Sequence, residues 1–295
     1  MIQFKKINLN FERKGFYILL APIFLIIAFY VYLKKKIVPQ PKFNFYFFDG
    51  VSKLCREVKE NAARWRALDL TYNNYAKNNT SFGDLVYNFF WHNLKNARAL
   101  RNRLKLIKHL LFKNIEEISK SGKEIRLISI ASGSAQGVIE TITLAKQKGI
   151  LVKSVFIDID PTALEYSRKL AQRLGVENQI TFVNKKASII NEIGKDFKPN
   201  LIEMVGFLEY RPEEKAIKLI QSIYQVLEKG GTFLVSHISP NLESFFLKEV
   251  INWPMIYRRP EEIVRILSLA SFSLENCSFY WEPLKIHYCA ECKKI

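Results

Sequence analysis

Two apolar runs joined by a turn of small residues organise the chain. The first run, Ile125 to Ile130, meets the turn at 131–137, and a helix-like segment, Val138 to Lys148, leads into the second run, Val152 to Ile157. This order predicts a strand, a tight turn, a helix and a strand, which is a βαβ unit that binds a nucleoside. Small side chains let a ligand approach the backbone, and the helix N-terminus offers N–H groups to an anion. Asp158 follows the second run, where its carboxylate can accept hydrogen bonds from a ribose diol.

The alternation of apolar strands and longer amphipathic segments continues to the end of the chain. Helices are predicted at 160–173, 212–228, 241–251 and 260–269. Further strands are predicted at Ile180–Val183, Leu201–Val205, Thr232–Ser236, Ser273–Phe279 and Leu284–Cys292. Strands that alternate with helices predict an α/β fold with a doubly wound, parallel sheet.

A different pattern opens the chain. Residues 16–33 form an uncharged run of 18 residues, flanked by tyrosines and followed by Lys34, Lys35 and Lys36. A transmembrane helix needs about 20 apolar residues, so 16–33 is predicted to span a membrane and 1–36 to be a membrane anchor. A buried helix of a globular domain is the alternative. Lysines and arginines are balanced on the two sides of the run, so charge does not predict its orientation.

Between the anchor and the βαβ unit, residues 37–120 are predicted to form a linker and a helical cap or lid. The linker contains two prolines, and helix-forming residues with many aromatics follow it. Its clearest helix is Ala97 to Leu111, with apolar residues on one face and a row of basic residues beside it. Such a helix either lies on an anionic membrane or packs on a core with a solvated basic edge.

Composition adds two constraints. The formal charge is +17, from 45 lysines and arginines against 28 acidic residues, which favours an anionic neighbour such as a lipid surface. The four cysteines are too few and too scattered for a disulfide framework, which favours a reducing compartment. Cys289 and Cys292 have the spacing of metal ligands, but no second pair accompanies them, so no metal is expected.

The spacing of the small residues narrows the choice of nucleoside ligand. A dinucleotide fingerprint has glycines at i, i+2 and i+5, and Gln136 or Val138 occupies the position where the last glycine would fall. Small residues at i, i+2 and i+4, namely Ala131, Gly133 and Ala135, instead resemble motif I of the class I S-adenosylmethionine (SAM)-dependent methyltransferases.

Three further segments resemble this family in the right order. Ile157 to Pro161 resembles its second motif, Glu203 to Tyr210 its fourth-strand segment, and Leu227 to Thr232 its turn before strand five. A group of bacterial proteins assigned as methyltransferases has sequences similar to Ser129–Ser134, Met204–Tyr210 and Trp253–Pro260. The resemblance covers about 124–295. It implies a Rossmann-like, seven-stranded methyltransferase sheet over 121–295, with SAM as cofactor.

The resemblance also implies site residues. The turn should hold the methionyl part of SAM, the residues after the second strand the ribose, the loop after the third strand the adenine, and the fourth strand the sulfonium. These cofactor residues are Ala131, Ser132, Gly133, Ala135, Asp158, Ile159, Lys186, Ala187, Met204 and Val205. Two positions depart from the family, because Ser129 and Lys186 stand where acidic residues are usual.

A hydroxyl acceptor would need a general base in addition to alignment. His237, after the strand 232–236, and Glu203 are the candidate catalytic residues, and His92 is a weaker one. For each, a purely structural role is the alternative.

The predicted function is therefore a membrane-anchored, SAM-dependent methyltransferase that acts on a small-molecule or lipid acceptor. An aminopropyltransferase-like enzyme and a non-catalytic, membrane-bound scaffold are the alternatives. SAM is kept in the cytosol, so the predicted location is a membrane, with the catalytic domain facing the cytoplasm. The expected partners are an anionic lipid surface and the substrate, and nucleic acid is not expected.

Overall fold

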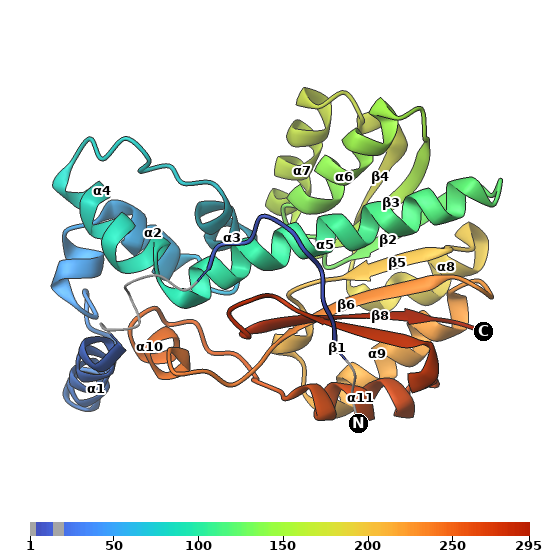
Figure 1. Ribbon diagram of the computed structural model, residues 1–295. Coiled ribbons are helices and arrows are strands. Elements are labelled where there is room, and N and C mark those ends of the chain that lie inside the picture. Colours follow the sequence, from blue (N-terminus) through green and yellow to red (C-terminus); the bar gives the residue numbers. More distant parts are fainter. Residues whose placement is uncertain (1–3, 14–20) are drawn as a thin grey trace.

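The computed structural model describes residues 4–13 and 21–295, and its centre is a mixed β-sheet (Figure 1). In the described part of the chain the sheet has eight strands, in the order β1-β7-β8-β6-β5-β2-β3-β4. They are β1 (Phe4–Lys5), β2 (Ile125–Ile130), β3 (Val152–Asp158), β4 (Ile180–Asn184), β5 (Leu201–Met204), β6 (Thr232–Ile238), β7 (Cys277–Trp281) and β8 (His287–Lys293). β8 runs antiparallel to both of its neighbours, and the other pairs are parallel.

The predicted α/β class is correct, but the predicted seven-stranded, parallel sheet is wrong. The eighth strand is β1, which pairs with β7 so that Phe4 lies opposite Phe279. The Phe4 ring also stacks on Trp281, with 5.2 Å between the ring centroids. A strand of two residues is too short to show an alternation of apolar and polar positions, so only its pairing in the folded protein reveals it.

Helices cover both faces of the sheet. The helices are α1 (Ala21–Ile37), α2 (Lys53–Glu60), α3 (Trp65–Tyr72), α4 (Phe82–Val86), α5 (Lys95–Lys120), α6 (Gln136–Gln147), α7 (Pro161–Arg173), α8 (Ile190–Phe197), α9 (Glu213–Val226), α10 (Ser244–Glu249) and α11 (Pro260–Leu269). One core joins α5, α6 and α7 to the sheet, and a second joins α8, α9 and α11 to its other face (Figure 1). This two-sided cover explains why the central strands are apolar on both faces.

The elements near the predicted βαβ unit form where the sequence indicates. β2 matches the first apolar run, and α6 follows the small-residue turn. Asp160 caps α7, because its side chain accepts a hydrogen bond from the Thr162 N–H, and Pro161 starts the helix. α8 was not among the predicted helices, although it lies in the same layer as α9.

The N-terminal helices have a core of their own. Side chains of α1, α2, α3 and the start of α5 pack with those of α10, which comes from the other end of the chain. Phe246 of α10 lies between Phe24 and Phe48, with centroid distances of 5.2 and 5.5 Å. This helical group lies beside the sheet, next to α5 and α10 (Figure 1).

The predicted transmembrane helix is wrong. No helix within 4–13 and 21–295 is both long and apolar enough to cross a membrane. Residues 16–20 of the predicted span lie outside the described residues, and the rest belongs to α1, which has 17 residues and ends in three lysines and an isoleucine. α1 buries Phe24, Ala28 and Val31 in the helical core, so part of the apolar run serves packing.

Residues 4–13, which precede the apolar run, pack on the same body as the residues after it. Glu12 accepts two hydrogen bonds from Arg101 of α5, both 2.6 Å, and β1 joins the sheet. The predicted membrane anchor at 1–36 and the predicted membrane location both depended on the spanning helix, so neither is supported.

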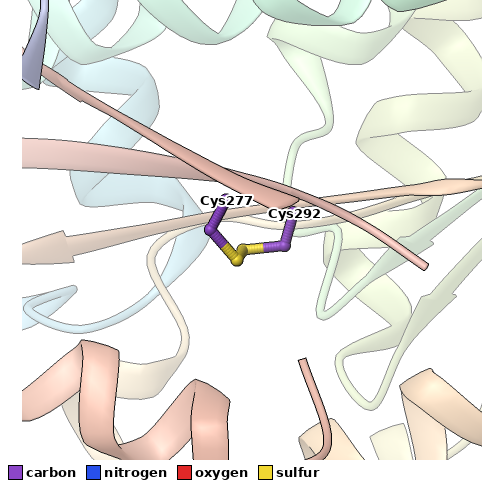
Figure 2. The surroundings of a disulfide bond; sticks show 2 residues. All are labelled: Cys277 and Cys292. Atoms are coloured by element: carbon purple, nitrogen blue, oxygen red, sulfur yellow. A yellow bond between two sulfur atoms is a disulfide. The ribbon is translucent and has the colours of Figure 1, made fainter. Parts of the chain in front are cut away.

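One cysteine pair also departs from expectation. Cys277 of β7 and Cys292 of β8 lie opposite each other in the antiparallel pair and form a disulfide (Figure 2). Their separation of 15 residues carries no pairing signal, and the strand register brings them together. Cys292 is one of the two cysteines that have the spacing of metal ligands, and its sulfur is bonded to that of Cys277. Cys55 and Cys289 are free and buried.

Candidate active site

A cavity of about 800 Å³ opens at the carboxyl ends of β2, β3 and β5. β2 is the point where the strand order reverses, since β3 and β4 follow on one side and β5 and β6 on the other. Open α/β sheets bind ligands at such a switch point. The fold therefore places the cavity where the sequence predicted a nucleoside.

The cavity has two halves of different origin. One half, which we call the cofactor half because the sequence predicts cofactor binding there, is made by the turn 131–137, the segment 157–160 and the loop 185–188. The aromatic half is made by side chains from the helical group and from loops near β5 and α10. Its residues are Trp65, Leu68, Tyr72, Tyr210 and Trp253.

The turn has an unusual backbone. Ala131, Gly133 and Ala135 have φ angles of 51°, 54° and 47°, all in the left-handed region. A non-glycine residue in this region costs about 1–2 kcal/mol, and the cost rises for branched side chains. The turn itself therefore favours small residues at these alternate positions. A Cβ added to Gly133 would meet only Trp65, at 3.6 Å, so space remains open above the turn.

Asp158 lies beside this turn. Its Oδ2 accepts a hydrogen bond of 2.7 Å from the Gly133 N–H, and its Oδ1 accepts one of 2.8 Å from the Asp160 N–H. Burial raises the pKa of Asp158, although these two bonds oppose the shift. An ionised carboxylate can accept about four hydrogen bonds, so two acceptor positions remain for a ligand. Asp158 and the exposed Ile159 both line the cavity.

Lys186 and Ala187 line the cavity on the loop after β4, and Ala187 begins the short helix η5 (Ala187–Ile189). Asn184, the last residue of β4, has a structural role beside this loop. Its side chain donates hydrogen bonds to the carbonyls of Asp158 and Ile159, at 3.1 and 2.9 Å. Asn184 thus holds the two loops together.

At the end of β5, alternate residues point to opposite faces of the sheet. Glu203 and Val205 line the cavity, whereas the Met204 side chain is buried in the core on the other side. Glu203 accepts a hydrogen bond of 2.6 Å from the Ser129 hydroxyl. Burial raises the pKa of Glu203 to about 7, and the Ser129 hydrogen bond opposes the shift. Ser129, a departure from the family pattern, is thus the partner of Glu203.

The structure places His237 outside the cavity. It is buried on β6, its Nε2 lies 3.0 Å from Nη1 of Arg258, and burial lowers its pKa to about 3. His92 does not line the cavity either. Burial and the charge of Arg101 lower its pKa to about 4. Both imidazoles are neutral at physiological pH.

Several cavity residues were not predicted. Trp65 and Tyr72 come from the two ends of α3, Arg103 comes from α5, and Trp253 follows α10. Tyr210 and Trp253 are joined by a hydrogen bond of 2.6 Å. Tyr210 and Trp253 lie in segments whose amino-acid sequences resemble the methyltransferases. Trp65, Tyr72 and Arg103 lie in segments without this resemblance.

The region from 59 to 259 matches the model of a protein family described as "Putative methyltransferase". The match covers more than half of the chain and includes both halves of the cavity. The chain belongs to this methyltransferase family. The methyltransferase is of class I and uses SAM as its methyl donor.

Solved structures show the same fold. A protein of Bordetella parapertussis described as a "possible exported protein" is 14% identical, with a TM-score of 0.66 over 95% of the methyltransferase and 97% of that chain. Magnesium protoporphyrin IX methyltransferase of Synechocystis PCC 6803, solved with bound SAH, is 15% identical, with a TM-score of 0.51 over 67% and 85% of the two chains. The SAM-dependent methyltransferase SibL is 13% identical, with a TM-score of 0.50 over 82% and 68%. None of the curated proteins compared with the methyltransferase matches it.

Proposed function

We propose that the methyltransferase transfers the methyl group of SAM to a small molecule that binds in the aromatic half of the cavity. One observation carries the proposal: a single cavity joins the turn and Asp158 to a wall of aromatic side chains. Its volume of about 800 Å³ lies within the range of roughly 300–1,000 Å³ that small-molecule sites occupy.

The residues of the cofactor half fit SAM. The open space above Gly133 admits a ligand close to the backbone, and Asp158 has acceptor positions left for a ribose diol. Ile159 and Ala187 offer apolar surface to an adenine ring. Glu203 places a carboxyl group at the end of β5, which favours a cationic ligand. When bound, SAM supplies an electrophilic methyl group.

We assign the role of a lid over this site to the helical group within residues 37–120, whereas the rest of α5 packs in the core of the sheet. Three contacts tie α3 to the sheet domain. The Trp65 indole donates a hydrogen bond of 2.9 Å to Thr162, and the Tyr166 hydroxyl donates one of 2.6 Å to Asp69. The Asn73 amide donates one of 2.9 Å to Gln136 at the start of α6. A lid so held excludes water and aligns the acceptor, which methyl transfer requires.

The test is calorimetry with SAM. Asp158→Asn keeps the size of the side chain but replaces one oxygen by an amide nitrogen, so hydrogen bonds to the ribose are lost. Charge-assisted hydrogen bonds contribute about 1.5–3 kcal/mol, so SAM affinity should fall at least about tenfold, and Asp158→Ala should show a similar or larger loss.

Asp196→Asn is the matched control, because Asp196 is exposed on α8 and does not line the cavity. This variant should bind SAM as the wild type does. Wild-type affinity in a folded Asp158→Asn variant would remove Asp158 from the site.

A further inference from the structure

A second, smaller cavity of about 30 Å³ adjoins the main one. Leu68, Arg103, Gly206, Tyr210 and Trp253 line both cavities. The remaining walls of the small cavity are mostly apolar and include Trp91, Leu100, Leu247 and Met255. A space of this size holds one water molecule or one small polar group.

Glu209 lines this small cavity and lacks the partners that a buried carboxylate needs. Its side chain is 2% exposed, and neither oxygen has a hydrogen-bond partner among the described residues. The nearest cation is Arg103, whose Nη1 lies 3.7 Å from Oε1 of Glu209. Nε of Arg103 is also buried without a partner in the same described set. Burying charged groups is costly unless they are hydrogen-bonded as well as paired, so a ligand is expected to complete the pair.

The backbone around Glu209 is firmly held. Glu209 lies in the short helix η6 (Leu208–Tyr210), and its carbonyl accepts a hydrogen bond of 2.8 Å from the Ile256 N–H. Arg258 donates hydrogen bonds to the carbonyls of Leu208 and Arg211, at 3.0 and 2.6 Å. The free carboxylate is therefore a feature of an ordered segment.

Arg103 connects the pair to the main cavity. Its Nη2 donates a hydrogen bond of 2.9 Å to the Tyr72 hydroxyl of the aromatic half. A Cβ added to Gly206 would lie 3.3 Å from Nη1 of Arg103, so the guanidinium packs against the backbone that follows β5. Gly206 comes directly after Val205, a predicted sulfonium-binding residue.

These contacts select a class of acceptor. A carboxylate with free oxygens takes an O–H or N–H donor. The adjacent guanidinium disfavours a protonated amine and favours an oxygen that gains negative charge as it loses its proton. The apolar walls suit a hydrocarbon frame. A neutral hydroxyl keeps the Glu209–Arg103 pair balanced in charge, whereas an ammonium group would add an unpaired buried cation.

We infer that Glu209 and Arg103 form the acceptor subsite, which takes the hydroxyl of a phenol or apolar alcohol, with Glu209 as the general base. The inference rests on the proposed function. The acceptor O–H bond breaks and its proton passes to Glu209, the oxygen forms a bond to the methyl carbon, and the donor sulfur keeps the electron pair of its broken bond. Glu209 then returns the proton to water.

Several charged and titratable groups surround Glu209. Burial raises the pKa of Glu209 above the usual value for a glutamate, and Arg103 on α5 and Arg258 before α11 oppose this shift. His287 on β8 lines the same cavity and is neutral, because burial and Arg103 lower its pKa. Tyr210 and Tyr288 are neutral, since burial raises the pKa of each. Among the described groups that line this cavity, Glu209 is therefore the one that can accept a proton and so change its charge with pH.

The test uses the full-length methyltransferase, SAM, and a probe panel of 4-ethylphenol, 4-nitrophenol, benzyl alcohol and benzylamine. The wild type should bind SAM and methylate a hydroxyl compound in preference to benzylamine, with turnover rising with pH as Glu209 loses its proton. Glu209→Gln should bind SAM within about twofold of the wild type. Its turnover should fall about 100-fold or more, and the pH-dependent rise should be absent.

Calorimetry with 4-ethylphenol gives a readout that does not need turnover, and Glu209→Gln should weaken that binding. Glu275→Gln, an exposed glutamate outside both cavities, is the matched control and should behave as the wild type does. Glu209→Gln leaves Arg103 unpaired, so the double variant Arg103→Gln/Glu209→Gln removes both charges and should show the same loss of turnover.

Two results overturn the inference while the proposed function stands. One is a wild type that binds SAM but methylates no hydroxyl compound of the panel. The other is wild-type turnover in folded Glu209→Gln and in the double variant. Failure of the wild type to bind SAM would instead overturn the proposed function itself.

Discussion

The two halves of the cavity differ in how the chain builds them. The cofactor half comes mainly from one continuous stretch, because the turn 131–137 and Asp158 belong to a single βαβ unit. The aromatic half gathers Trp65, Tyr210 and Trp253 from segments far apart in the sequence. The first half depends on the backbone of one turn and on Asp158, whereas the second depends on side chains that only the tertiary fold brings together.

The largest expected effect is at the turn, because the cofactor half depends on the backbone of this one segment. Gly133→Val should abolish measurable SAM binding, because a branched side chain at φ +54° strains the turn and fills the space that the ligand needs. Calorimetry measures the loss. Gly122→Val is the matched control, since Gly122 has φ +73° with nothing within 4 Å and lies outside the cavity. If both variants bind SAM equally well, the turn is not the cofactor site.

Glu203 lines the cavity at the end of β5, and its protonation should affect the stability of the fold. Its pKa is about 7 in the folded protein against 4.5 as a reference, so the folded state binds the proton more tightly. This contribution is fully present below pH 4.5 and is lost as the pH rises through about 7, a change of about 3 kcal/mol.

Glu203→Gln lacks this proton-linked change and can still accept the Ser129 hydrogen bond. Its free energy of unfolding should therefore exceed that of the wild type by a margin that grows from pH 5 to pH 8, up to about 3 kcal/mol. Urea unfolding at several pH values measures the margin. Parallel pH curves for the two proteins would show that Glu203 does not titrate in this range.

The smallest expected effect concerns backbone strain. Ala131 has φ 51°, a conformation that glycine adopts without penalty. Ala131→Gly should therefore stabilise the fold by up to about 1 kcal/mol, once the greater entropy of glycine in the unfolded chain is included. Ala171→Gly in α7 is the control and should destabilise by about 1 kcal/mol, because Ala171 is buried in a helix. Thermal unfolding compares the two, and a loss of stability in Ala131→Gly would contradict the strain argument.

The errors of sequence reasoning share a physical origin. The apolar run at 16–33 has the length of a membrane span, but α1 uses Phe24 and Val31 to pack on α10, more than 200 residues away. β1 and the Cys277–Cys292 disulfide depend on which strands pair and in which register, and the sequence of each segment alone does not show this. Each of these features depends on a partner that is distant in the sequence.

The sequence by itself determined the βαβ unit, the small-residue turn, Asp158 and the methyltransferase resemblance. These features follow from local rules: apolar periodicity, left-handed turns that need small residues, and a carboxylate at a strand end. Only the tertiary structure decided that Ser129 pairs with Glu203, that His237 lies away from the cavity, and that Glu209 meets Arg103. The environment of a side chain is set by whatever packs against it, and here those neighbours come from helices and strands far along the chain.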